Sequence, residues 1–256
     1  MTVLQTLVFD ELSVEVYPDS RAMGYAAAQV AAQIIREAVA ARGIANIILA
    51  TGNSQLEFLK ALRALPDIPW QAVNAFHMDE YVHLPPGHPA GFPLTLRRNI
   101  IDHVQIGNFF PVPGLASDLD EACRGYEALL RAHPADLCCL GIGENGHLAF
   151  NEPFDADFQD PRWVKVISLT ETSRRQQVGE GHFASVEETP THAITLTIPA
   201  LLAARRILAI APETRKADIV YRTLHDEIGT ACPATVLRKT AHARLFLDAD
   251  SAAKIL

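Results

Sequence analysis

The chain has 256 residues, of which 49% are hydrophobic and 20% are charged, and its 22 Lys and Arg against 30 Asp and Glu give a formal net charge of −8. This length and hydrophobic content are typical of one globular α/β domain, expected over residues 1–256, and exclude an intrinsically disordered chain. The acidic balance argues against nonspecific binding of nucleic acid and against attraction to anionic membranes.

The N-terminal segment and the cysteines indicate the cellular compartment. Residues 1–16 have no basic region before their apolar residues and contain Asp10 and Glu11, so they do not resemble a signal peptide. No apolar run approaches the roughly 18 residues that a membrane-spanning helix needs. The four cysteines form no CxxC motif, and the adjacent Cys138 and Cys139 would point to opposite faces of a strand. We therefore expect a cytoplasmic protein with reduced cysteines and no membrane partner.

Strand and helix patterns alternate along the chain. A strand over residues 12–17 precedes a long alanine-rich helix, which Asp19 or Ser20 would cap and Gly43 would end. The later predicted elements are strand 44–50, turn 51–54, helix 55–65, strand 72–77, helices near 92–103 and 118–132, strands 135–142, 164–169 and 192–197, helix 198–204, strand 206–211, helix 214–226 and strand 243–248. Several of these strands are apolar on both faces, as a parallel sheet covered by helices requires. The sequence therefore predicts an α/β fold, a three-layer Rossmann-like α/β/α arrangement with a mostly parallel sheet.

Three polar segments follow predicted strands, at the edge of the sheet where ligands bind in such folds. The first is the turn Thr51-Gly52-Asn53-Ser54. Gly52 would let the backbone approach a ligand closely, and Ser54 would cap the following helix. The N–H groups at the start of that helix favour an anion such as a phosphate. The alternative is an ordinary capped turn without a ligand.

The second segment begins with His77 and includes the adjacent carboxylates Asp79 and Glu80. Carboxylates at the end of a strand suit proton transfer when they are partly desolvated. A rival interpretation is a metal site formed by His77, Asp79, Glu80, His83 and His88. Their spacing matches no recognised ligand motif, so we expect neither a metal nor another cofactor. A polar loop without chemistry is the third possibility.

The third segment, residues 141–153, contains a literal GxGxxG after a strand. A dinucleotide-binding fold does not fit, because Asn151-Glu152-Pro153 cuts off the long helix that must follow the glycines. The glycines instead predict a tight loop that presents His147 beside Glu152, a pair suited to act as proton shuttle and orienting carboxylate. A purely structural histidine is the alternative. With no GxSxG elbow or cysteine nucleophile motif, the candidate chemistry is acid–base catalysis on an anionic small molecule.

Together these segments resemble the glucosamine-6-phosphate deaminase (isomerase) family, which shares its fold with the 6-phosphogluconolactonases. The resemblance covers most of the chain. It is strongest over residues 78–89 and 141–153, and weaker over 49–54, 194–204 and 233–248. The lactonases usually continue GHTASLFP after the shared histidine, whereas this chain has GHLAFNEP. The resemblance therefore favours the deaminases.

The resemblance implies conversion of glucosamine 6-phosphate and water into fructose 6-phosphate and ammonia, without a cofactor. Asp79 would move a proton between C2 and C1 of the open-chain sugar phosphate. His147, oriented by Glu152, would assist opening of the pyranose ring. The turn 51–54 and Lys216 would bind the phosphate. The expected partner is this small-molecule substrate, and a homo-oligomer is possible.

Three departures from the family pattern bear on function. Many members have Asp where this chain has Asn145, which can orient an imidazole but cannot take up a proton. A phosphate-binding arginine lies in the lid of well-known members, and Arg174 or Arg175 is the candidate here. Phe154 and Asp155 replace the serines of allosterically activated members, so we expect no activation by the N-acetylated sugar phosphate.

Two other functions stay open at this point. The same site could hydrolyse 6-phosphogluconolactone, with His147 as the base. The chain could also be a sugar-phosphate-binding regulator without catalysis, an interpretation that Asn145 and the altered lid motivate. One fold hosts several chemistries, and the motifs favour the deaminase over both alternatives.

Overall fold

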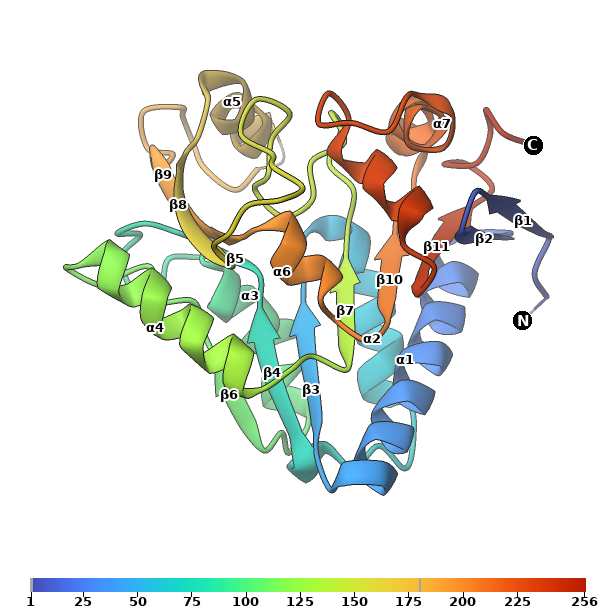
Figure 1. The fold of residues 1–256 in the computed structure, drawn as a ribbon, viewed down its shortest axis with the longest axis horizontal. Helices are drawn as coiled ribbons and strands as arrows, with labels where there is room; N and C mark the ends of the chain where they lie inside the picture. Colours follow the sequence, from blue (N-terminus) through green and yellow to red (C-terminus); the bar gives the residue numbers. More distant parts are fainter. Residues whose placement is uncertain (1, 180) are drawn as a thin grey trace.

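The computed structural model describes residues 2–179 and 181–256. Its largest element is an eight-stranded sheet in the order β1-β2-β11-β10-β7-β3-β4-β6 (Figure 1). The strands span Gln5–Phe9 (β1), Leu12–Tyr17 (β2), Ala243–Asp248 (β11), Ile207–Ile210 (β10), Leu137–Leu140 (β7), Ala45–Leu49 (β3), Val73–His77 (β4) and Asn108–Phe110 (β6). Neighbouring strands run parallel except β1 and β2, an antiparallel pair at one edge.

Helices cover both faces of this sheet. One face carries α1 (Ser20–Arg42), α2 (Leu56–Ala64) and α3 (Phe92–Asn99), and the other carries α4 (Leu119–Ala132), α6 (Ile198–Leu202) and α7 (Ala217–His225). Successive side chains of a strand point to opposite faces of the sheet, so Cys138 packs in the core under α4, α6 and α7, while Cys139 packs in the core under α1, α2 and α3. The four cysteines are buried and unpaired. This arrangement confirms the predicted three-layer, Rossmann-like α/β/α fold with a mostly parallel sheet.

The long helix α1 begins and ends where the sequence predicts. The Asp19 side chain accepts a hydrogen bond from the backbone N of Ala22 at 2.7 Å, and Gly43 ends the helix in the left-handed conformation with φ 78°. Small residues let α1 pack closely on α2. A Cβ atom on Gly24 would lie 2.9 Å from the backbone of Glu57, so a larger residue would push the two helices apart.

A second, smaller sheet lies beside the carboxyl ends of the parallel strands (Figure 1). It is antiparallel and consists of β5 (Asp79–Tyr81), β9 (His192–Leu196) and β8 (Val164–Ser168), with α5 (Glu171–Gly179) following β8. The sequence predicts the two longer strands but does not separate them from the main sheet. An apolar pattern shows that a strand is buried without showing which strand it pairs with.

Other elements differ from the prediction in extent. The predicted helix 214–226 starts as a 3-10 turn, η4 (Thr214–Lys216), and the predicted helix 92–103 divides into α3 and η3 (Ile101–His103). The remaining 3-10 segments are η1 (Asn53–Gln55), η2 (Trp70–Ala72) and η5 (Pro233–Lys239). The strands β5 and β6 are not predicted, because three residues hold little periodic pattern, and β1 is not predicted, because most of its residues are exposed.

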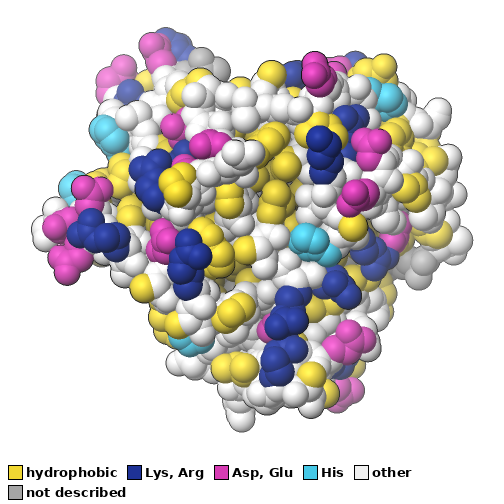
Figure 2. Space-filling model, viewed as in Figure 1, with side chains coloured by type: hydrophobic (Ala, Val, Ile, Leu, Met, Phe, Trp, Pro, Cys, Tyr) yellow, Lys and Arg dark blue, Asp and Glu magenta, His cyan; other side chains and the backbone are white. Residues whose placement is uncertain are grey.

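On the face of the molecule that Figure 2 shows, the surface charges are mixed rather than separated. Acidic and basic side chains are interspersed over most of this face, with one short row of basic side chains near the lower centre. That face therefore has no extended basic field of the kind that binds nucleic acid. Within the residues that the structure describes, no helix is long and apolar enough to cross a membrane.

Candidate active site

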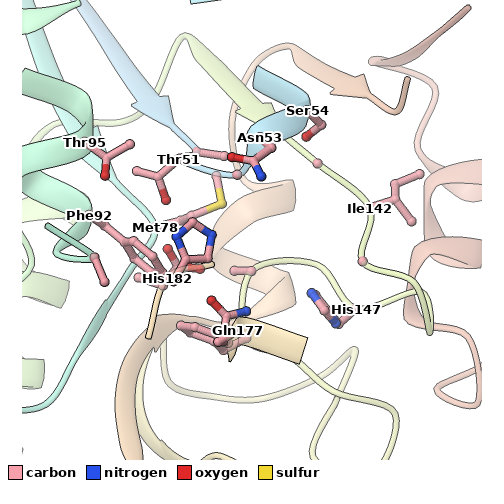
Figure 3. A pocket seen from close by; sticks show the side chains of 18 of the residues that line it. Thr51, Asn53, Ser54, Met78, Phe92, Thr95, Ile142, His147, Gln177 and His182 are labelled. Atoms are coloured by element: carbon pink, nitrogen blue, oxygen red, sulfur yellow. The ribbon is translucent and has the colours of Figure 1, made fainter. Parts of the chain in front are cut away.

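The candidate site is a pocket at the carboxyl ends of β3, β4, β7 and β10 (Figure 3). The chain runs through β3, β4 and β6 in one direction and then returns to place β7, β10 and β11 on the other side of β3. Parallel α/β sheets bind ligands at such a reversal. The lining residues are Ala50, Thr51, Gly52, Asn53, Ser54, Met78, Asp79, Ala90, Phe92, Thr95, Gly141, Ile142, Gly143, His147, Ala149, Phe150, Gln177, His182, Arg215 and Lys216.

The turn 51–54 forms one wall of the pocket, opposite His147 and Gln177 (Figure 3). The prediction that Ser54 caps the following helix is wrong. Ser54 lies inside η1, α2 begins at Leu56, and neither element has a side-chain cap. A capping residue must precede the first helical residue with an extended backbone, so the 3-10 turn moves Ser54 out of the capping position.

Ser54 instead turns its hydroxyl toward neighbouring polar groups at the pocket wall. The Gln55 Nε2 atom donates to Ser54 Oγ at 3.0 Å. A Cβ atom on Gly141 would lie 2.9 Å from the same hydroxyl, so the glycine after β7 leaves room for it. The wall therefore combines a hydroxyl with backbone that a ligand can approach closely.

Two cationic residues line the pocket from η4, which follows β10. Lys216 is buried, and Arg215 precedes it in the chain. Arg215 forms ion pairs with Glu213 (Nε to Oε2, 2.7 Å) and with Glu144 (Nη1 to Oε1, 3.3 Å). Lys216 is the phosphate contact that the sequence predicts, whereas Arg215, which precedes it in the same segment, is given no role there.

The two candidate lid arginines do not line the pocket. Arg174 donates to backbone carbonyls, through Nε to Thr189 at 3.1 Å and through Nη2 to Val186. Arg175 forms an exposed ion pair with Glu171 of the same helix. The structure therefore does not bring either guanidinium together with the turn 51–54.

Asp79 lies in the pocket because it begins β5, whose register pairs it with Thr195 of β9. Its side chain is almost fully buried, and burial raises the pKa of Asp79 from 3.8 to about 7. Desolvation disfavours the charged form of a carboxyl group. A carboxyl group with a pKa near neutrality can both accept and return a proton at physiological pH.

The neighbouring Glu80 does not line this pocket, and its carboxylate instead binds backbone N–H groups of the protein. Its two carboxylate oxygens accept hydrogen bonds from the backbone N atoms of Tyr81 at 2.7 Å and Phe92 at 3.2 Å. Burial, and then the nearby charge of Asp79, raise the pKa of Glu80 to about 8 against the lowering effect of these hydrogen bonds. Glu80 therefore ties α3 to β5 and thereby positions Asp79.

The histidines of the rival metal interpretation are not gathered around Asp79. His77 accepts from the backbone N of Val112 through Nε2 at 2.7 Å, and burial lowers its pKa to about 3. His83 lies against a backbone carbonyl, and His88 accepts from a backbone N–H. Among the residues that the structure describes, no three His, Cys, Asp or Glu side chains are placed to hold a metal ion.

His147 is presented by the glycine-rich loop after β7. The backbone N of Gly143 donates to His147 O at 3.0 Å, and that of Gly146 donates to Gly143 O at 3.0 Å, which closes the loop. The imidazole packs over Gly143, where a Cβ atom would lie 2.1 Å from the ring, and Gly146 has φ 91°. Residues 144–156 form turns rather than a helix, so this GxGxxG lacks the context of a dinucleotide site.

Asn145 connects the imidazole to the glutamate. Its Oδ1 atom lies 2.9 Å from His147 Nδ1 and accepts from the backbone N of His147 at 3.1 Å, while its Nδ2 atom donates to Glu152 Oε2. Glu152 Oε1 lies 3.3 Å from His147 Nδ1 and accepts from Ser173 Oγ at 3.0 Å. Both groups that face Nδ1 are acceptors, so Nδ1 carries a proton and Nε2 is the basic nitrogen.

The charge of Glu152 follows from this network. Burial alone would raise its pKa, but hydrogen bonds from His147, Asn145 and Ser173 outweigh burial and hold the pKa of Glu152 below 4.5. The carboxylate is therefore ionised at neutral pH. An ionised carboxylate beside Nδ1 can stabilise an imidazolium that forms when Nε2 takes up a proton.

Four further lining residues are missed by the sequence analysis: Phe92, Thr95, Gln177 and His182. Gln177 belongs to α5, and its Oε1 atom accepts from the hydroxyl of the buried Tyr81 at 2.6 Å. His182 follows α5 and lies at the same hollow (Figure 3). Phe92 and Thr95 belong to α3, and no charge pattern or motif marks any of the four residues, because the packing of α3 and α5 beside the small sheet brings them to the pocket.

Comparison with known proteins gives concordant matches. The family model for glucosamine-6-phosphate isomerases/6-phosphogluconolactonase matches residues 18–246. Glucosamine-6-phosphate deaminases of Bacillus cereus (strain G9842) and Bacillus thuringiensis (strain Al Hakam) are each 34% identical over 224 residues, which is 88% of this chain and 83% of theirs. The solved structure of a monomeric glucosamine-6-phosphate deaminase superposes with a TM-score of 0.85 at 28% identity, covering 94% of this chain and 99% of that chain.

A 6-phosphogluconolactonase from Trypanosoma brucei has a TM-score of 0.78 at 17% identity and covers 98% of this chain and 100% of its own. This match shows a common fold and carries no argument about activity.

Proposed function

Because the chain belongs to the glucosamine-6-phosphate isomerase/6-phosphogluconolactonase family, we propose that it is a glucosamine-6-phosphate deaminase of amino-sugar catabolism. The reaction converts glucosamine 6-phosphate and water into fructose 6-phosphate and ammonia. The observation that carries this proposal is one pocket lined by both the buried Asp79 and His147, whose imidazole is connected to Asn145 and Glu152 behind it. A carboxyl base and a proton shuttle are the two groups that this chemistry requires.

The phosphate would bind at the turn 51–54, with Lys216 as its cationic partner. The turn, which follows β3, and Lys216, which follows β10, line the same pocket, and β7 lies between these two strands in the sheet. A lysine at the start of a helix reinforces the positive end of the helix dipole, which favours an anion there. Binding of the phosphate at this wall would leave the sugar carbons to extend toward Asp79 and His147.

Ring opening is the first chemical step. Nε2 of His147 would take the proton of the C1 hydroxyl and return it to the ring oxygen, which breaks the C1–O5 bond and gives the open-chain aldehyde. Asn145 and Glu152 hold the imidazole through Nδ1, so the basic nitrogen is Nε2. Glu152 stays ionised and stabilises the transient imidazolium, and Asn145 orients the ring without taking part in proton transfer.

Asp79 would then carry the proton between the two carbons. Its carboxylate removes the C2 proton, the ammonium group of the substrate gives a proton to the carbonyl oxygen at C1, and an enolamine forms. Asp79 returns the proton to C1, which leaves a C2 imine that water hydrolyses to fructose 6-phosphate and ammonia. A pKa of about 7 suits both halves of this transfer, because the group is neither too weak a base nor too weak an acid.

A side-by-side assay tests the proposal. Purified protein is supplied with glucosamine 6-phosphate, with detection of ammonia and fructose 6-phosphate, and separately with 6-phosphogluconolactone, with detection of acid release. We expect equal amounts of ammonia and fructose 6-phosphate, and lactone hydrolysis at the uncatalysed rate. Lactone hydrolysis without ammonia would instead support a lactonase, and tight binding of glucosamine 6-phosphate without turnover would support a regulator.

A further inference from the structure

Fewer of the predicted cationic side chains line the pocket than the sequence indicates, because the two candidate lid arginines lie elsewhere. Arg174 and Arg175 point to other partners, so neither guanidinium reaches the pocket in this structure. Among the described residues that line the pocket, the arginine and lysine side chains are Arg215 and Lys216. A phosphate dianion held here by one lysine would lack the bidentate partner that arginine provides.

The backbone before Arg215 is held in a conformation that glycine usually adopts. Glu213 has φ 81° and ψ 145°, a region that is nearly closed to residues with a side chain. Both carboxylate oxygens of the buried Asp248 accept from Glu213 N at 3.1 Å, and Asp248 also accepts from Ser251 N at 2.8 Å. These contacts hold the backbone that leads into η4, from which Arg215 and Lys216 line the pocket. Such strained positions cluster at binding and catalytic sites.

Among the partners of Arg215 are the carboxylates of Glu144 and Glu213, which water also reaches. Its side chain is 34% exposed, and the side chains of Glu144 and Glu213 are each 47% exposed. Ion pairs with hydrated carboxylates contribute little net free energy, so an incoming anion can displace one of them. A guanidinium binds phosphate through two parallel hydrogen bonds, which a carboxylate at 3.3 Å from one nitrogen does not match.

We propose that Arg215 is a second phosphate-binding residue of this pocket, beside Lys216, and that it exchanges the carboxylate of Glu144 for the substrate phosphate. The identity of the substrate rests on the proposed function, whereas the binding of a phosphate group does not. Glu144 precedes Asn145 in the loop that carries His147. The exchange therefore links occupation of the phosphate site to the loop that holds the ring-opening residues.

Calorimetric titration of the full chain with inorganic phosphate at pH 7.5 and constant ionic strength tests this proposal without turnover. We expect Arg215→Gln to weaken phosphate binding about tenfold, the contribution of one charged hydrogen-bonding partner. Arg215→Lys should weaken binding less, since it keeps the charge and loses the paired donors. Arg222→Gln removes an exposed arginine paired with Asp226 on α7 and is the matched control, expected to bind phosphate as the wild type does.

Glu144→Gln separates this role from a structural one. If Arg215 exchanges partners, removal of the competing carboxylate should tighten phosphate binding roughly threefold, as expected for an exposed ion pair. If Arg215 only holds the loop through Glu144, both Arg215→Gln and Glu144→Gln should weaken binding alike, which would overturn the proposal. Unchanged phosphate binding in Arg215→Gln would also overturn it.

The outcome is independent of the deaminase assay. A wild-type protein that binds phosphate through Arg215 but releases no ammonia contradicts the proposed function and supports this inference. Ammonia release by a protein whose phosphate binding is unchanged in Arg215→Gln supports the proposed function and contradicts this inference. If Arg215→Gln does not fold, the phosphate affinity of Glu144→Gln tests the exchange by itself. Tighter binding than in the wild type supports the exchange, and weaker or unchanged binding contradicts it.

Discussion

Replacement of Asp79 by Asn should make the protein more stable above neutral pH. Burial raises the pKa of this carboxyl group from 3.8 to about 7, so the folded protein must hold a poorly solvated charge once the pH exceeds 7. One pKa unit corresponds to about 1.4 kcal/mol, so the whole rise corresponds to about 4 kcal/mol. The neutral amide group that replaces the carboxyl group carries no such penalty.

The direction of the pH dependence follows from proton binding. Between pH 4 and pH 7 the folded state keeps the Asp79 proton that the unfolded state has lost, so the wild type loses stability as the pH rises. Asp79→Asn removes this dependence. Its advantage over the wild type should therefore be less than about 2 kcal/mol at pH 5, grow through pH 7, and level off at about 4 kcal/mol by pH 8.

Urea unfolding of both proteins at pH 5, 6.5 and 8 measures this difference directly. Asp250→Asn is the control, because Asp250 is exposed and hydrated in both states. Its stability relative to the wild type should not change with pH. A constant difference between Asp79→Asn and the wild type at all three pH values would refute the reasoning, since it would show that Asp79 titrates alike in the folded and unfolded states.

Three further outcomes are expected. In steady-state assays, kcat/KM should rise with pH around an apparent pKa near 7 as Asp79 ionises, because Glu152 is already ionised at lower pH. If kcat/KM rose only below pH 5 and stayed constant above it, a group other than Asp79 would be the base. Lys165→Met should lower the free energy of unfolding in urea by about 1 to 2 kcal/mol, since the buried Asp160 loses Lys165, whose Nζ lies 3.3 Å away, but keeps its ion pair with Arg162; unchanged stability would show that the ion pair with Lys165 does not stabilise the fold. His147→Gln should slow turnover, and less so when the substrate is supplied ring-opened, and an equal loss on both forms would remove the ring-opening role.

The parts of the fold that local chemistry determines are predictable from the sequence. Asp19 caps α1 and Gly43 ends it because a short side-chain acceptor and a residue without Cβ suit those positions. The glycines around His147 predict a tight loop for the same kind of reason, and the imidazole indeed packs over Gly143 where no Cβ fits. Fully buried strands such as β3 are likewise evident from composition alone.

Features that depend on contacts distant in the chain are not predictable in this way. Ser54 has the residue type of a cap but lies inside a 3-10 turn. Arg174 lies in the expected segment, yet backbone carbonyls of the following loop take its guanidinium. Arg215 reaches the pocket because Asp248, a residue of the last strand, holds the backbone before it. In each case the sequence shows the functional group and tertiary structure decides where it points.

The proposed role of Asp79 as the base of a deaminase is tested by the release of ammonia from glucosamine 6-phosphate by the wild type, by Asp79→Asn and by the exposed-site control Asp250→Asn. We expect ammonia and fructose 6-phosphate in equal amounts from the wild type and from Asp250→Asn. We expect a rate lower by at least about a hundredfold from a folded Asp79→Asn, the lower end of the usual contribution of a general base. Near-normal ammonia release by Asp79→Asn would contradict the account.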